Sequence, residues 1–197
     1  MSMGDMMSKW EREEGVEFLE RIGVRAGQKV LDFGSGVGHY AIPAAIAVGS
    51  MGMVYAVDKD QEVLGELERK ATSLGLYNIK TIRSFGGVKI DLVEGSVDVV
   101  LLYDILHYFK EDERRKLYKE VLRVLRPHGL LSVYPKHVLG DEPHGEFKNI
   151  HLDDVIREIK DSGFSFKGKC CGTISHNNTV NPGCVLNFIK TSQHKKL

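Results

Sequence analysis

The sequence is poor in cysteine and proline, carries no net charge and contains no long apolar run. Of its 197 residues three are cysteine and five are proline, and 27 basic residues balance 27 acidic ones. No stretch reaches the eighteen or so apolar residues of a membrane span, and the polar start Met1–Lys9 lacks the apolar core of a secretory signal. Zero net charge excludes a global field that would attract nucleic acid. The odd number of cysteines, with Cys170 next to Cys171, predicts reduced thiols and a cytoplasmic protein.

Short apolar strands alternate with amphipathic helices along the whole chain, and no linker or repeat divides it. A single domain, residues 1–197, is therefore expected. Strands are expected at 29–33, 53–57, 78–83, 97–102 and 130–134, and helices at 11–22, 39–48, 61–74, 112–125 and from 152 to Gly163. Segments 164–169 and 184–190 have no helix between them, which predicts an antiparallel hairpin. Continuous apolar strands separated by helices are typical of an α/β protein with a parallel sheet covered on both faces.

Two of these strands end in residues suited to a nucleotide-like ligand. Val30–His39 reads as a strand that breaks into Gly34, Gly36 and Gly38 before a helix. Glycines allow a sharp turn and a close approach to a ligand, and the free N–H groups of the helix point at the same place. The next strand closes on Asp58, which can accept hydrogen bonds from both ribose hydroxyls. A glycine turn without a ligand is the plainer alternative.

Asp32, two residues before Gly34, decides between cofactors. A dinucleotide would place its pyrophosphate over the turn, and like charges ~4 Å apart cost on the order of 4 kcal/mol at an effective dielectric of about 20. The spacing also differs from the Gly-x-Gly-x-x-Gly of NAD-binding proteins. An ammonium and a sulfonium would instead be attracted. Here the chain resembles the class I S-adenosylmethionine-dependent methyltransferases, whose first motif is Asp-x-Gly-x-Gly-x-Gly.

The resemblance covers most of the chain. Segments 96–100, 122–129 and 161–164 look like the beginnings of the fourth, fifth and sixth strands in small-molecule methyltransferases, including the quinone-biosynthesis type. It implies a Rossmann-like, doubly wound, seven-stranded sheet, mostly parallel, with an antiparallel C-terminal strand. It also implies an N-terminal helix in 1–28, a cofactor-binding core in 29–135, a possible lid loop in 136–150, and a C-terminal helix and hairpin in 151–197. Two departures are His128 in place of a usual glycine, and Ser84-Phe85 in place of the usual acid that contacts the adenine amine.

The resemblance implies S-adenosyl-L-methionine as cofactor. The expected cofactor contacts are Asp32, Gly34, Ser35, Gly36, Gly38, His39, Asp58, Lys59, Ser84, Phe85 and Tyr103.

Acceptor-side residues should follow the carboxyl ends of the strands. His107, three residues after Asp104, is the candidate general base with Asp104 as its orienting carboxylate. Alternatively Asp104 caps a helix and His107 is a half-buried surface residue. Tyr134, Lys136 and His137 follow the fifth strand and form a second candidate group.

No metal is expected from the spacing along the chain. His137, His144 and His151 recur every seven residues and three cysteines lie further on. Zinc favours His and Cys, but no Cys-x-x-Cys pair and no His-x-x-x-His pair on a helix occurs.

The sequence therefore predicts a methyltransferase with an unidentified acceptor, for which a small molecule is favoured. A nicotinamide-dependent reductase shares the turn and the ribose acid but does not account for Asp32. A non-catalytic cofactor-binding module is the other alternative. From Ser162 to the end there are five lysines and no acidic residue, which leaves RNA or protein acceptors open, although a solvated edge explains the lysines more simply.

Overall fold

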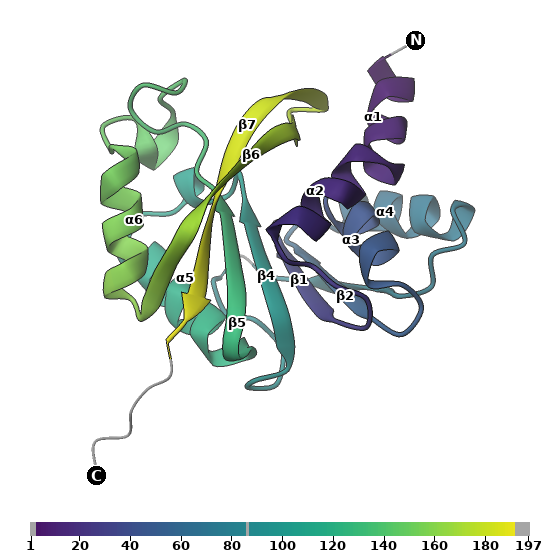
Figure 1. Ribbon diagram of the computed structural model, residues 1–197, viewed down its shortest axis with the longest axis horizontal. Helices are drawn as coiled ribbons and strands as arrows, with labels where there is room; N and C mark the ends of the chain where they lie inside the picture. The colour runs from purple at the N-terminus through teal and green to yellow at the C-terminus, as the bar shows by residue number, and fades with distance from the viewer. Residues whose placement is uncertain (1–2, 86, 192–197) are drawn as a thin grey trace.

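A seven-stranded sheet runs through the centre of the protein, as Figure 1 shows. The computed structural model describes residues 3–85 and 87–191. The strand order is β3-β2-β1-β4-β5-β7-β6, with parallel pairing from β3 to β5 and antiparallel pairing of β7 with both β5 and β6. The strands are β1 (Lys29–Phe33), β2 (Met53–Asp58), β3 (Ile79–Arg83), β4 (Val97–Tyr103), β5 (Leu125–Tyr134), β6 (Phe164–His176) and β7 (Thr179–Lys190). The predicted α/β fold with an inserted antiparallel C-terminal strand is confirmed.

Helices cover both faces of the sheet. One buried cluster joins it to α1 (Met3–Arg12), α2 (Glu14–Ile22), α3 (Ala41–Val48) and α4 (Gln61–Ser73). A second cluster, on the other face, joins it to α5 (Glu111–Val124) and α6 (Leu152–Asp161), and to the short 3-10 turns η1 (Leu106–Tyr108) and η2 (Gly145–Phe147). This double covering explains why β4 is buried along almost its whole length.

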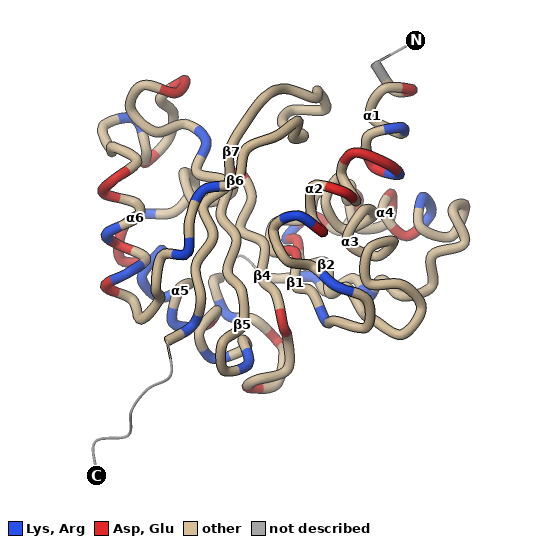
Figure 2. The backbone as a smooth tube through the Cα atoms, viewed as in Figure 1, with Lys and Arg blue, Asp and Glu red and all other residues tan. Residues whose placement is uncertain are grey.

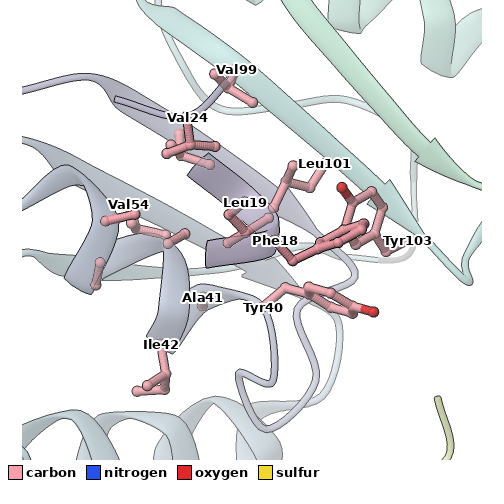
Figure 3. Packing of buried hydrophobic residues seen from close by; sticks show 14 of the residues in the cluster. Phe18, Leu19, Val24, Tyr40, Ala41, Ile42, Val54, Val99, Leu101 and Tyr103 are labelled. Atoms are coloured by element: carbon pink, nitrogen blue, oxygen red, sulfur yellow. The ribbon is translucent and has the colours of Figure 1, made fainter. Parts of the chain in front are cut away.

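The first cluster packs the N-terminal helices against the middle of the sheet. In Figure 3, Phe18 and Leu19 of α2 lie close to Leu101 and Tyr103 of β4, with Tyr40 at the start of α3 beside them. Phe18 and Leu19 are 1% and 0% exposed. Burying a side chain of this size contributes about 1.5–3 kcal/mol, so α2 is held by its apolar face.

The N-terminal segment forms two helices where the sequence predicted one over 11–22. The chain breaks at Glu13, whose backbone is not helical, and Gly15 lies against Trp10. A Cβ on Gly15 would approach the Trp10 carbonyl oxygen to 2.9 Å, so glycine permits the close turn. Trp10 is 1% exposed, and its indole N–H donates to the Thr173 carbonyl at 3.0 Å. Helix α1 is thereby attached to the C-terminal hairpin.

The C-terminal hairpin is longer than predicted. Strands β6 and β7 are joined by Asn177 and Asn178, which both have positive φ (50° and 56°), the backbone that a two-residue type I′ turn requires. Figure 1 shows the hairpin projecting past the ends of β4 and β5. Its tip therefore extends beyond the sheet proper, toward the glycine turn after β1.

The prediction of reduced cysteines is wrong for two of the three. Cys171 and Cys184 are direct partners in the β6–β7 ladder and form a disulfide, while Cys170 is free. Antiparallel partners bring their Cβ atoms within disulfide range. The pairing depends on the strand register, which counting cysteines could not reveal.

The lysine-rich C-terminal region forms the outer edge of the sheet. The ladder between β6 and β7 shifts register between Phe166 and Gly168, and Lys167 and Lys169 flank this irregularity. Lys190 donates to the carbonyl oxygens of Leu122 and Leu125, both at 2.6 Å, at the end of α5. One lysine of this region thus caps the C-terminal end of helix α5.

The expected N-terminal and C-terminal segments extend beyond the described ranges, at residues 1–2 and 192–197.

Charges of both signs are interleaved on the outer helices, as Figure 2 shows for α5 and α6. Ion pairs such as Arg115–Glu111 and Lys116–Asp112 join successive turns of α5. No helix within residues 3–85 and 87–191 is both long and apolar enough to cross a bilayer.

Replacing Cys184 by Ser should lower the free energy of unfolding by up to ~3 kcal/mol, the value for cross-linking a loop of about 15 residues. Chemical denaturation measures the change, and Cys170→Ser, in the partner strand β6 but outside the disulfide, is the matched control with no expected loss. If alkylation of the unreduced, unfolded protein labels three thiols, the disulfide is absent.

Candidate functional site

A cavity of about 780 Å³ opens at the carboxyl ends of β1, β2 and β4. This is the edge where open parallel sheets bind ligands, and the volume is in the range of small-molecule sites. Most of the residues predicted to contact ligands line it: Gly34, Ser35, Gly36, His39, Asp58, Lys59, Ser84, Tyr103 and Asp104. Asp32, Gly38, Phe85 and His107 are not part of the lining.

The three glycines of the turn have different tasks, although all have positive φ (82°, 50° and 91°). A Cβ on Gly34 would approach Ile105 to 2.6 Å, and one on Gly38 would approach Leu67 to 2.3 Å. These two glycines let the backbone of the turn pack closely against the side chains of Ile105 and Leu67. A Cβ on Gly36 would meet no protein atom within 4 Å. Gly36 therefore presents bare backbone to the cavity, as a ligand cradle requires.

Asp58 closes β2 and holds the turn as well as facing the cavity. Its Oδ2 accepts a hydrogen bond from the Gly36 N–H at 2.9 Å, and its Oδ1 accepts one from the Asp60 N–H at 3.0 Å. The carboxylate oxygens retain further acceptor positions. Asp58 can therefore order the turn and still accept hydrogen bonds from a ligand.

Asp32 lies behind the turn as a buried acid. Its side chain is 2% exposed and Oδ2 has no hydrogen-bond partner in the protein. Burial, and next the neighbouring Asp58, raise the pKa of Asp32 from 3.8 to about 7, while His39 and the Ala41 N–H act in the opposite direction. An incompletely satisfied buried carboxylate is costly. A cationic group at the glycine turn would compensate it.

His39 belongs to a polar group that the sequence reading missed. Its Nδ1 is 2.7 Å from Glu11 Oε1, and its Nε2 is 2.6 Å from Asn178 Oδ1. Glu11 is 1% exposed and also accepts from Lys70 Nζ at 2.5 Å. The contacts join the N-terminal helices, the glycine turn, α4 and the hairpin tip. Because the partners are 28 and 139 residues from His39, no local sequence pattern predicts these contacts.

The hairpin tip forms a wall of the cavity, which was also not predicted. Ser175, His176, Asn177 and Asn178 line it. The Tyr40 hydroxyl donates to the Ser175 carbonyl at 2.8 Å, which fixes the hairpin to the start of α3. The Asn-Asn turn was the available sequence signal, because adjacent asparagines tolerate the left-handed backbone of a tight hairpin.

Of the two aromatic residues predicted to contact the cofactor, Tyr103 lines the cavity and Phe85 does not. Tyr103 lines the cavity, and its ring stands edge-on to Tyr40 with centroids 4.5 Å apart. Its hydroxyl is 2.8 Å from Ser132 Oγ, and burial raises its pKa well above 10. Phe85 is 93% exposed and lies against Arg83, so the structure does not bring it to the cavity. Ser84 does line the wall.

Asp104 and His107 lie near each other within a larger histidine cluster, with no hydrogen bond between them. Asp104 Oδ1 is 3.5 Å from both His107 Nδ1 and His137 Nε2, and Asp104 Oδ2 is 3.0 Å from His176 Nε2. Asp104 and His176 line the cavity. His107 is 2% exposed behind them, and burial, together with His137, His144 and His176, lowers its pKa to about 4. His107 is therefore neutral and shielded, and His176 is the better placed base.

The second candidate group is divided between a neighbouring cavity and the histidine cluster. Tyr134 and Lys136 line a neighbouring cavity of about 340 Å³, and Lys136 Nζ is paired with Asp141 at 2.6 Å. His137 joins the histidine cluster instead. In the expected lid segment 136–150, Val138 and Phe147 are buried in the second hydrophobic cluster.

Comparison with known proteins identifies the family. A family model described as a methyltransferase domain matches residues 30–129. The chain belongs to this methyltransferase family. The matched segment begins in β1 and ends in β5, so it contains the glycine turn, Asp58 and the Asp104 region.

Named relatives and solved structures agree with this membership. Aklanonic acid methyltransferase from a Streptomyces strain is 36% identical over 104 residues, covering 46% of this chain and 47% of that protein. Demethylmenaquinone methyltransferase from Geobacillus stearothermophilus is 30% identical over 122 residues, covering 62% and 49%. A SAM-dependent methyltransferase from Aquifex aeolicus has the same fold, with a TM-score of 0.73, 24% identity and 92% coverage of both chains. The chain spans about half the length of the two named relatives.

The predicted recognition as a class I S-adenosylmethionine-dependent methyltransferase is thereby confirmed, and S-adenosylmethionine is its cofactor. The residues fit that molecule. Gly36 leaves open space at the turn, and Asp32 holds an unpaired acceptor oxygen next to it in the chain. An anionic pyrophosphate could use the open space at Gly36, but it would be repelled by the Asp32 carboxylate.

Asp32→Asn should stabilise the ligand-free protein at pH 8. The pKa of Asp32 is raised from 3.8 to about 7 in the folded state, so its charge opposes folding fully above pH 7 and ever less as the pH falls toward 4. The gain is at most ~4 kcal/mol, at about 1.4 kcal/mol per pKa unit. Urea unfolding at pH 8 and pH 5 measures it. Asp91→Asn, at an exposed aspartate, is the control; equal stability changes for Asp32→Asn at both pH values would contradict the prediction.

Proposed function

We propose that this protein transfers a methyl group from S-adenosylmethionine to a small-molecule acceptor. The observation that carries the proposal is the continuity of the 780 Å³ cavity, which extends from Gly36, Asp58 and Ser84 to Asp104 and His176. Groups suited to the cofactor and groups able to accept a proton thus line one continuous cavity. The named relatives act, by their names, on aklanonic acid and on demethylmenaquinone, and both names describe small molecules.

In this proposal the turn and the strand ends hold the cofactor. Gly36 lets the backbone lie against its methionine part, and Asp32 faces the ammonium. Asp58, whose carboxylate lines the cavity, accepts hydrogen bonds from the ribose. Ser84 is the remaining polar side chain at the adenine end, since Phe85 points to solvent. Tyr103 borders the methionine end.

The cofactor supplies an activated methyl group, which an acceptor lone pair attacks in line as the carbon–sulfur bond breaks. The residues of this chain then have two tasks, to align the two molecules and to exclude water. An acceptor hydroxyl must also lose its proton. The Asp104–His176 pair, with 3.0 Å between Oδ2 and Nε2, lines the cavity and is the nearest group able to take it.

Three alternatives make different demands on the same cavity. A nicotinamide-dependent reductase would bring a pyrophosphate to the turn, close to Asp32 and Asp58, which is electrostatically unfavourable. A non-catalytic binding module would keep the cofactor end and have no use for the polar acceptor end. An RNA acceptor would need a basic surface leading to the cavity, and a protein acceptor would need an open one. The acidic and basic residues are instead interleaved on the outer helices (Figure 2), which does not favour RNA.

Ligand selectivity tests the proposal directly. S-adenosylmethionine and S-adenosylhomocysteine should both raise the melting temperature, because a ligand that binds only the native state stabilises it by RT ln(1 + [L]/Kd). NAD and NADP should leave it unchanged in the same thermal-shift series. A shift with NADH and none with the two sulfur compounds would refute the proposal.

Gly36→Ala tests where the cofactor lies. The added methyl group meets no protein atom within 4 Å, so it should weaken S-adenosylhomocysteine binding at least tenfold by occupying ligand space. Gly95→Ala is the matched control, because Gly95 also has positive φ (61°, against 50° at Gly36) and open space, but lies outside the cavity. Both variants carry the same backbone strain. Equal affinities in calorimetry would move the cofactor away from the glycine turn.

A further inference from the structure

The fold gathers one acid and three histidines from three separate segments of the chain. Asp104 follows β4, His107 lies in η1, His137 follows β5 and His176 ends β6. Ligand atoms of Asp104, His107 and His137 all lie within 4.8 Å of one another. The sequence predicted no metal because it offered no paired Cys or His spacing, and here two ligands follow β4 while the third follows β5.

The separations match those of metal ligands. Asp104 Oδ1 is 3.5 Å from His107 Nδ1 and 3.5 Å from His137 Nε2. Bonds of about 2.0–2.1 Å in a tetrahedral zinc site place ligand atoms ~3.3 Å apart. A direct hydrogen bond between such groups would be shorter, at about 2.7–3.2 Å.

Hydrogen bonding around the cluster leaves electron pairs facing each other. His137 Nδ1 lies 2.9 Å from the Glu142 carbonyl oxygen, which can only accept, so Nδ1 carries the hydrogen and Nε2 has a lone pair. His137 Nε2 also lies 3.3 Å from His176 Nε2. Asp104 Oδ1 and His107 Nδ1 are buried and have no hydrogen-bond partner, and the His107 side chain is 2% exposed. Within the described residues, these three electron-pair donors converge with no hydrogen bond joining them to one another.

We propose that Asp104 Oδ1, His107 Nδ1 and His137 Nε2 bind one divalent transition-metal ion of the zinc type. Two imidazoles with one carboxylate are a donor set that zinc and ferrous iron accept, whereas magnesium prefers oxygen alone. His176 holds the other carboxylate oxygen of Asp104 at 3.0 Å, and the Glu142 carbonyl orients His137. Such outer contacts fix the direction of metal ligands.

Three protein ligands leave a fourth position free, as in catalytic rather than structural zinc sites. Asp104 and His176 line the large cavity, so the metal borders its acceptor end. If the proposed methyl transfer is correct, on which this consequence rests, the metal would hold an acceptor hydroxyl at the fourth position and lower its pKa, and the proton would pass to His176 in the same cavity.

Metal binding by the full-length, untagged protein tests the site without cofactor or acceptor. After dialysis against a chelator, titration with Co²⁺ should give one ion per chain and the visible absorption of a low-symmetry site, and Zn²⁺ should displace it. His137→Asn should weaken binding at least tenfold. His128→Asn is the matched control, because His128 also has positive φ (61°, against 72° at His137) and lies in the irregular first part of β5, outside the cluster.

Asp104→Asn is the second variant, and circular dichroism melting shows whether each variant is folded. Absence of saturable binding, full affinity in both cluster variants, or equal loss in His128→Asn would overturn the site. Because this readout needs no methyl transfer, a failed metal titration leaves the proposed function intact. Conversely, failure of S-adenosylmethionine to bind would refute the function and leave the metal site standing.

Discussion

The parallel pairing of β1 with both β2 and β4 sets which side chains can meet at the cavity. Asp32 aligns with Ala56 on one side and Leu101 on the other, so the three strands end at the same edge. The N–H groups of Gly34 and Ser35 then both donate to the Val57 carbonyl, at 2.8 and 3.0 Å, and tie the glycine turn to β2. A slip of one residue would turn every side chain of β1 to the opposite face.

This edge concentrates features that oppose folding. Asp32 is buried with an unpaired oxygen, and Asp104 and His137 have left-handed backbones, with φ of 54° and 72°. Strain of this kind persists only where the surrounding packing fixes it, and it gathers at functional sites. The two hydrophobic clusters on the faces of the sheet provide that packing. Stability and site chemistry therefore come from different layers of the same fold.

Local patterns predicted the strand–turn–helix unit, the sheet and the acid at the end of β2, because each is encoded in a short continuous segment. The same reasoning missed the contact between His39 and Asn178, which are 139 residues apart. It placed Phe85 in the site although its side chain is exposed, because strand ends predict position and not side-chain direction. The disulfide depends on which residues of β6 and β7 pair, and the histidine cluster depends on which strand ends are neighbours. Neither can be predicted from composition or from spacing along the chain.

The two edge strands of the sheet, β3 and β6, have features that oppose pairing with strands of other copies of this chain. A sheet edge exposes unpaired N–H and C=O groups that invite another strand. At one edge β3 has only five residues. At the other edge the ladder of β6 is irregular beside Gly168, and Lys167 and Lys169 bracket the irregularity. Short length, a bulge and lysines are the devices that natural sheets use against intermolecular pairing. Growth of this sheet into fibrous aggregates is thus opposed at both ends.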